Sequence, residues 1–124
     1  MVVQAANARG QSRRTFCQAM KETGWLQFGG SVKPEQCNFG GLGSTGGGVA
    51  GASFDDVHTG LLAQAQHLKA YASTKPLNKT CVDPRFDLVK RGCAPKLEDL
   101  DGRWAVPGVG YGESILSMIE DMIA

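Results

Sequence analysis

Residues 18–25 place a carboxylic acid where it could act as a proton donor. Apolar residues at helical spacing precede Gly24, which marks the expected end of a helix. Glu22 would then lie on the last helical turn, near the negative end of the helix dipole and beside the Trp25 indole. Both neighbours disfavour the ionised form, so we expect a raised pKa for Glu22. Such a carboxylic acid can hold its proton near neutral pH. The simpler alternative is a solvated residue at a helix end.

Length and composition indicate one domain, residues 1–124, with a single modest core. Thirteen basic residues against 12 acidic residues leave the chain nearly neutral, so charge favours neither nucleic acid nor an anionic membrane as a partner. No apolar run is long enough to insert into a membrane. Residues 1–10 lack the order of a secretion signal, so no signal peptide is visible.

Three helices are expected to position Glu22 and its surroundings. The first begins near Ser12, a plausible N-cap, and ends at Gly24. The second begins after Asp55 or Asp56 and runs to about residue 73. The last covers residues 113–123, and short turns are expected at residues 86–90 and 97–100. The fold class is therefore mainly α.

The second helix carries an apolar stripe that we expect to be buried. The residues of this stripe are Leu61, Ala65, Leu68 and Ala72. The polar residues Gln64, Gln66 and Lys69 are expected outside it, and His58 and His67 also fall away from the stripe. We therefore interpret both histidines as surface residues rather than ligands.

The 17 glycines are the main departure from average composition, and residues 40–51 are especially rich in them. A phosphate-binding loop would require a lysine and a hydroxyl directly after the glycines, whereas Val49 follows here. A glycine-rich hairpin or lid beside a ligand groove fits better, because missing side chains let a bulky polymer approach the backbone.

The four cysteines lack the paired spacing of a zinc site, and we expect no metal and no cofactor. Cys81 and Cys93 bracket a short loop and could form a disulfide if the protein works outside a cell. Cys17 lies on the helix of Glu22 and is expected to be a small packed residue.

Four short segments, taken in order, carry a resemblance to a known family. They are Glu22-Thr23-Gly24-Trp25, Asn38-Phe39-Gly40-Gly41-Leu42-Gly43, Trp104-Ala105-Val106 and Tyr111. Their order, spacing and contexts resemble the glucosaminidase domain of glycoside hydrolase family 73, and the match runs from about residue 10 to the C-terminus. The helical segment 62–72 is also similar to members of that family.

The resemblance implies a small lysozyme-like fold with a groove for glycan. It implies hydrolysis of the β-1,4 bond between N-acetylglucosamine and N-acetylmuramic acid in peptidoglycan. The catalytic glutamate of the family falls on Glu22, and its Asn-Phe-Gly segment falls on Asn38, Phe39 and Gly40. Trp104 replaces a family tyrosine, and Tyr111 matches a later one. The expected partner is then a bacterial glycan strand. The expected setting is the cell wall or the extracellular space, for an autolysin or a phage lysin released at lysis. We expect a monomer.

The second catalytic group is open at this point. Longer family members are proposed to use a glutamate on a β-hairpin, but residues 40–54 contain no acidic residue. Asp55 and Asp56 follow that segment and are candidates, although helix capping explains them equally; Glu35 and Glu113 are the other acids available. The 2-acetamido group of the substrate could also attack the anomeric carbon, so that no protein nucleophile is needed.

Aromatic residues and one amide are expected to contact the glycan. Phe39, Trp104 and Tyr111 are candidates for lining the groove, with core packing as the alternative for each. Asn38 could bond an acetamido group or fix the loop backbone. The competing functions are a peptidoglycan-binding module without catalysis, a lytic transglycosylase that uses the same acid, and a purely structural protein.

Overall fold

The structure is a computed structural model that describes residues 4–44 and 49–123, and within these residues it is mainly helical with no β-strand. The three α-helices are α1 (Gln4–Thr23), α2 (Val57–Ala72) and α3 (Tyr111–Ile123). Three short 3-10 helices connect them, namely η1 (Pro34–Gln36), η2 (Phe86–Leu88) and η3 (Leu97–Leu100). The expected mainly α class is confirmed.

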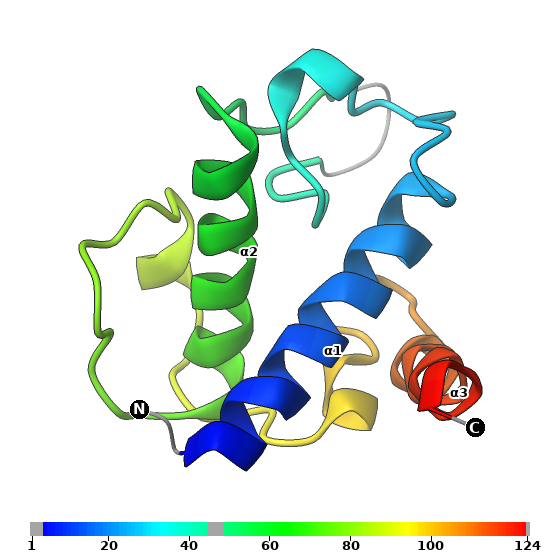
Figure 1. Cartoon of the computed structure of the whole chain (residues 1–124). Coiled ribbons are helices and arrows are strands. Elements are labelled where there is room, and N and C mark those ends of the chain that lie inside the picture. The colour runs from blue at the N-terminus through cyan, green and yellow to red at the C-terminus, as the bar shows by residue number, and fades with distance from the viewer. Residues whose placement is uncertain (1–3, 45–48, 124) are drawn as a thin grey trace.

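Helices α1 and α2 are inclined to each other, and the segment that joins them lies at the end where they diverge (Figure 1). Helix α3 packs against α1 and η3, while η2 packs against α2. The core lies where α1, α3 and η3 meet, and its fully buried members include Cys17, Leu100 and Ile115. The long chain connections therefore lie around α2 and at the open end of the α1–α2 pair.

Helix α1 starts at Gln4, so the expected N-cap at Ser12 is wrong and lies inside the helix. Its end is as expected, because Gly24 has a φ of +57° and cannot continue the helix. The amide of Trp25 donates to the Met20 carbonyl at 2.7 Å and closes the helix end. Glu22 is thereby confirmed on the last turn of α1.

Helix α2 begins where its cap predicts. The Asp56 carboxylate accepts a hydrogen bond from the Thr59 amide at 2.7 Å, and the helix ends at Ala72. Its buried face differs from the expected one, because Gln64, Gln66 and His67 are buried. Of the predicted stripe only Leu68 is buried; Leu61, Ala65 and Ala72 are half-buried.

Partners outside the helix explain the buried polar face of α2. Gln66 illustrates this, because its amide nitrogen donates to the Thr80 carbonyl at 2.9 Å and its oxygen accepts from the Val82 amide at 2.8 Å. A buried amide is tolerated when its donors and acceptors are paired. Helical periodicity alone cannot show such long-range partners.

The glycine-rich segment forms a loop without strand pairing in its described part. The Ala52 amide donates to the Leu42 carbonyl at 2.9 Å, and the Ser44 hydroxyl donates to the Val49 carbonyl at 3.0 Å. The tip of the expected hairpin, residues 45–48, lies outside the described residues. Among the described residues, a few hydrogen bonds join the two sides of the loop.

All four cysteines are free thiols in the structure, so the disulfide that Cys81 and Cys93 could form outside a cell is not present. Cys81 instead contacts the Asp83 carbonyl at 3.5 Å. Cys17 is packed in the core as expected. No helix within the described part of the chain combines the length and apolar character needed to cross a membrane.

Contact between Gly60 and the Cys37 carbonyl sets how closely α2 approaches the loop before the glycine-rich segment. A Cβ at Gly60 would lie 1.8 Å from the Cys37 carbonyl oxygen. We expect Gly60→Ala to lower the free energy of unfolding by about 1–3 kcal/mol, because the backbone must shift to relieve this overlap. Urea unfolding checks the prediction. Gly29→Ala is the matched control, since no atom lies within 4 Å of its Cβ position; equal stability of the two variants would contradict the prediction.

Candidate functional site

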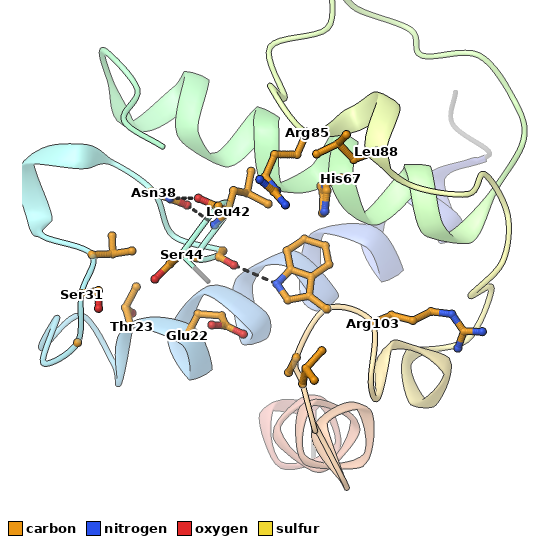
Figure 2. A pocket seen from close by; sticks show the side chains of 18 of the residues that line it. Glu22, Thr23, Ser31, Asn38, Leu42, Ser44, His67, Arg85, Leu88 and Arg103 are labelled. Atoms are coloured by element: carbon orange, nitrogen blue, oxygen red, sulfur yellow. Dashed lines mark hydrogen bonds between the residues drawn. The ribbon is translucent and has the colours of Figure 1, made fainter. Parts of the chain in front are cut away.

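A cleft of about 670 Å³ lies between the end of α1 with the turn after it, the glycine-rich loop, α2, the segment around η2 and the segment around Trp104. Glu22 projects into it from α1, and His67 and Arg85 line the side opposite Glu22 (Figure 2). The Trp104 indole also lines the cleft. Elements that are far apart in the sequence therefore meet at this cleft.

Glu22 is accessible to solvent, but the walls of the cleft surround its carboxylate. The residue is exposed because it stands in an open cleft, yet the cleft walls displace water from around its carboxylate. This desolvation raises the pKa of Glu22 above its ordinary value of 4.5, and it outweighs the hydrogen bond from Tyr111 and the charge of Lys21, which lower it. The direction of the expected shift is confirmed. Its source is the cleft and not Trp25, whose side chain is 61% exposed and does not line the cleft.

Tyr111 lies beneath Glu22 and holds its carboxylate. The Tyr111 hydroxyl donates to Glu22 Oε2 at 2.5 Å, which is the length of a strong charge-assisted hydrogen bond. Burial raises the pKa of Tyr111 far above its ordinary range, so the phenol remains a donor. Tyr111 is buried in the first turn of α3 and does not line the cleft, so its expected place in the groove wall is corrected.

Two buried glutamines fix the direction of the Tyr111 hydrogen bond. Gln64 Nε2 donates to the Thr15 carbonyl at 3.0 Å and to Gln18 Oε1 at 2.8 Å. Because a carbonyl can only accept, the Gln64 nitrogen must face this side, and the Gln18 nitrogen must then face Tyr111. Gln18 Nε2 donates to the Tyr111 hydroxyl at 3.0 Å. The single phenolic hydrogen is therefore directed to Glu22. We call this series of hydrogen-bonded side chains, Gln64, Gln18 and Tyr111, the glutamine–tyrosine chain.

The glycine-rich loop brings its backbone against the site. A Cβ at Gly40 would lie 2.9 Å from Gln64 Cγ and 3.1 Å from Trp104 Cζ2. A Cβ at Gly41 would lie 3.2 Å from Glu22 Oε1, and Gly41 has a φ of +68°. The left-handed φ and the nearby carboxylate favour glycine at position 41, whereas a side chain at position 40 would have to displace Gln64 or the Trp104 indole.

Asn38 fixes this loop from within. The buried amide nitrogen donates to the Leu42 carbonyl at 2.9 Å and to the Ala52 carbonyl at 3.0 Å. Its oxygen accepts from the Leu42 amide at 2.9 Å. Of the two roles predicted for Asn38, the structure shows the one that holds the loop backbone.

The two aromatic candidates of the loop and the Trp104 segment separate in space. Trp104 lines the cleft, and its Nε1 donates to the Gly40 carbonyl at 3.0 Å. An indole N–H thus anchors the loop at the position where the family resemblance places a tyrosine. Phe39 instead packs edge-on against Phe28, with ring centroids 6.2 Å apart, and does not line the cleft.

The structure does not bring Asp55 or Asp56 to the cleft. Both are exposed, and Asp56 caps α2, where the hydrogen bond from the Thr59 amide lowers the pKa of its carboxyl. Glu35 and Glu113 are also exposed and away from the cleft. Glu22 is the sole carboxylate among the described residues that line the cleft. Our expectation that Asp55 or Asp56 assists Glu22 is therefore not supported by their positions.

Sequence reasoning missed a histidine in the cleft. His67 is 7% exposed and its Nδ1 lies 2.7 Å from Asp83 Oδ2, so its interpretation as a surface residue is wrong. The available signal was helical spacing, since Gln64, His67 and Tyr71 share one face of α2. His58, in contrast, is exposed as expected.

Comparison with known protein families finds no family model that matches this chain, and comparison with solved structures finds no match. The chain is 49% identical over 90 residues to an uncharacterized protein of Borreliella burgdorferi. The aligned part covers 73% of this chain and 44% of that relative, so the chain spans less than half of the length of the relative.

Removal of the Tyr111 hydroxyl should raise the pKa of Glu22 further, because its hydrogen bond stabilises the ionised carboxylate. Nuclear magnetic resonance titration of the Glu22 carboxyl carbon in the Tyr111→Phe protein checks this. Tyr71→Phe is the matched control, since the Tyr71 hydroxyl contacts the Arg103 carbonyl and not Glu22. An unchanged or lower pKa of Glu22 in Tyr111→Phe would contradict the assigned direction of the bond.

Asp56→Ala should affect stability and not chemistry. Loss of the cap is expected to lower the free energy of unfolding by about 1 kcal/mol. Glu22 and the cleft around it should be unchanged, because Asp56 lies outside the cleft. Thermal unfolding and nuclear magnetic resonance titration of the Glu22 carboxyl carbon test both points, and a clearly shifted pKa of Glu22 in the folded variant would contradict the second.

Proposed function

We propose that this chain is a peptidoglycan hydrolase that cleaves the β-1,4 bond between N-acetylglucosamine and N-acetylmuramic acid, with Glu22 as the general acid. The observation that carries the proposal is the environment of Glu22. Its carboxyl has a raised pKa through desolvation in the cleft, and one of its oxygens is fixed by Tyr111. These are the properties required of an acid that protonates a leaving sugar oxygen.

The family resemblance supports the same function. Its motifs are widely spaced in the sequence, yet Glu22, the loop after Asn38, Trp104 and Tyr111 gather around one cleft. We also propose a lysozyme-like fold, because Glu22 lies at the C-terminal end of a helix and faces a cleft. The bond cleaved would place the protein at the cell wall or outside the cell, or in a lysate produced by a phage.

The two oxygens of Glu22 have different roles in the proposed reaction. Oε2 accepts the hydrogen bond from Tyr111, whereas Oε1 lies against the Gly41 backbone. Oε1 is therefore the oxygen that passes its proton to the departing sugar oxygen as the glycosidic C–O bond breaks. Tyr111 and Lys21 then stabilise the resulting carboxylate. Trp104 offers an aromatic surface to the sugar C–H groups at the cleft wall.

The lining of the cleft favours the substrate itself as the second group. Glu22 is the one carboxylate in the described lining, and residues 45–48, which are Thr and three Gly, supply no acid. The carbonyl oxygen of the 2-acetamido group would attack the anomeric carbon while Glu22 protonates the leaving oxygen. Water would then open the cyclic intermediate and return a proton to Glu22, so the anomeric configuration is retained.

The same observation favours two alternative functions. A peptidoglycan-binding module needs no second acid, and a lytic transglycosylase uses a single acid and forms anhydro-muramic ends. Mass spectrometry of products from purified peptidoglycan separates all three, because a binding module releases no new ends. Reducing ends on N-acetylglucosamine are the result expected of the proposed hydrolase.

Glu22→Gln should lower the cleavage rate by about 100- to 10,000-fold, which is the usual contribution of a general acid. The variant should remain folded, since the amide oxygen can still accept from Tyr111. Release of reducing ends from peptidoglycan, with circular dichroism as the folding check, measures both. Glu35→Gln is the control, because Glu35 is exposed in η1 and away from the cleft. Wild-type turnover by Glu22→Gln would remove Glu22 from the acid role.

Cleavage by the wild-type protein should also fall as pH rises. Only the protonated form of Glu22 donates, and desolvation raises its pKa, so activity is kept to a higher pH than an ordinary glutamate would allow and is lost as pH passes the raised pKa. A pH–rate profile measured with saturating glycan checks this direction. A rate that increases across that range would contradict it.

A further inference from the structure

The side of the cleft opposite Glu22 holds a second polar arrangement that the proposed chemistry does not use. His67 Nδ1 lies 2.7 Å from Asp83 Oδ2, and the two side chains are 9% and 0% exposed. Since Nδ1 is engaged by Asp83, Nε2 is the ring nitrogen left for the cleft. Edge-on contacts with Trp104, at 4.8 Å between centroids, and with Tyr71, at 5.4 Å, fix the ring plane.

The same carboxylate also positions an arginine. Asp83 Oδ1 accepts from the Arg85 amide at 2.9 Å and fixes the backbone where the Arg85 side chain leaves it. Figure 2 shows this side chain projecting into the cleft from the side opposite Glu22. Arg85 is half-buried, and its guanidinium has no hydrogen-bond or ion-pair partner among the described residues.

The other arginine of the cleft lining differs in this respect. The Arg103 guanidinium donates to the Asp99 carbonyl at 2.9 Å and is directed away from His67 and Arg85 (Figure 2). Arg85 is thus the cation left to meet a ligand in the described cleft. Partial burial of an unpaired guanidinium is unfavourable, and an anionic ligand group would relieve it.

We propose that Arg85 and His67 form a subsite that binds a carboxylate of the glycan ligand. The inference rests on the proposed function, because it takes peptidoglycan as the ligand. The planar guanidinium can donate two parallel hydrogen bonds to a carboxylate, and His67 Nε2 offers a further polar contact beside it. N-acetylglucosamine carries no charge, so the carboxylate belongs either to the stem peptide or to the lactyl group of N-acetylmuramic acid.

The subsite would act in specificity. Chitooligosaccharides share the N-acetylglucosamine units and the β-1,4 bond of peptidoglycan but have no carboxylate. A cleft with only Glu22 and Trp104 would treat the two glycans alike, whereas Arg85 and His67 select the one that carries an anion.

Affinity for three soluble ligands tests the subsite. They are peptidoglycan fragments with stem peptides, the same fragments stripped by an amidase so that the lactyl carboxylate is free, and chitooligosaccharides. Calorimetric Kd values are measured in the Glu22→Gln protein, so that no ligand is consumed. Arg85→Gln is added to this background, and Lys90→Gln is the control, with the same loss of charge at an exposed residue away from the cleft.

We expect Arg85→Gln to weaken binding of carboxylate-bearing fragments by about 10-fold or more, as for loss of a charge-assisted hydrogen bond. Chitooligosaccharide binding should stay within about twofold, and Arg85→Lys should recover part of the loss because it keeps the charge but not the paired geometry. Loss with intact fragments alone assigns the stem carboxylate. Loss with stripped fragments alone assigns the lactyl carboxylate, because in intact fragments that group forms the amide bond to the stem. Loss with both shows that the subsite accepts either carboxylate. His67→Gln should show the same ligand preference with a smaller effect.

Equal loss on all three ligands, or no loss on any, would overturn the subsite. Failure of the proposed hydrolysis is seen separately, as wild-type protein that releases no reducing ends yet binds the fragments. If wild-type protein binds none of the three ligands, both proposals fall. Arg85 is outside the core, so its substitution leaves the fold available for the test.

Discussion

The hydrogen bond from Tyr111 to Glu22 is the constraint on which the arrangement of the cleft depends. It joins the first turn of α3 to the last turn of α1 across 89 residues of sequence. The glutamine–tyrosine chain extends it to α2, so one line of hydrogen bonds connects all three helices at the acid. The Thr15 carbonyl at one end of this line can only accept a hydrogen bond, so it fixes the donor-to-acceptor direction of every hydrogen bond that follows. The helix packing and the orientation of the Glu22 carboxylate are consequently specified by the same contacts.

The fixed orientation of the Gln64 amide leaves one buried acceptor without a hydrogen bond among the described residues. Gln64 Oε1 is buried without a hydrogen-bond partner in the described part of the chain. An unpaired buried acceptor costs about 1–3 kcal/mol, and rotation of the amide would place this oxygen against the Thr15 carbonyl and Gln18 Oε1. The two hydrogen bonds of the Gln64 nitrogen outweigh that loss. Close packing of Gly40 on Gln64 leaves no room for a side chain that could supply another donor.

Local signals in the sequence were sufficient for the helices and for Glu22. Asp56 predicts the start of α2, and Gly24 predicts the end of α1, because caps and left-handed residues act within a few positions. The buried face of α2 was not predictable in this way. Gln64, Gln66 and His67 are buried because residues 14 to 49 positions away in the sequence pair with them or pack on them. Hydrophobic periodicity treats such residues as solvent-facing.

The contrast between local signals and partners distant in the sequence also explains which site residues were predicted correctly. Asp55 and Asp56 were attractive because they follow the glycine-rich segment, but a capping aspartate serves the local backbone and cannot also face the cleft. Tyr111 was expected in a groove wall because glycines precede it. Its hydroxyl instead needs the buried position that α3 provides, where it meets Gln18 and Glu22 together. Asp83, which orders His67 and the backbone of Arg85, has no local signal beyond its residue type.

The distribution of charge in the cleft connects these features. A guanidinium close to Glu22 would stabilise its ionised form and lower the pKa that an acid must keep high. Arg85 and His67 lie across the cleft from Glu22, and neither is among the influences on the pKa of Glu22, which are desolvation, Tyr111 and Lys21. Trp104 itself is held by the Gly40 carbonyl and by the ring of His67. An acid that must stay protonated and a guanidinium that could bind an anion can therefore share one cleft, because they line opposite sides of it.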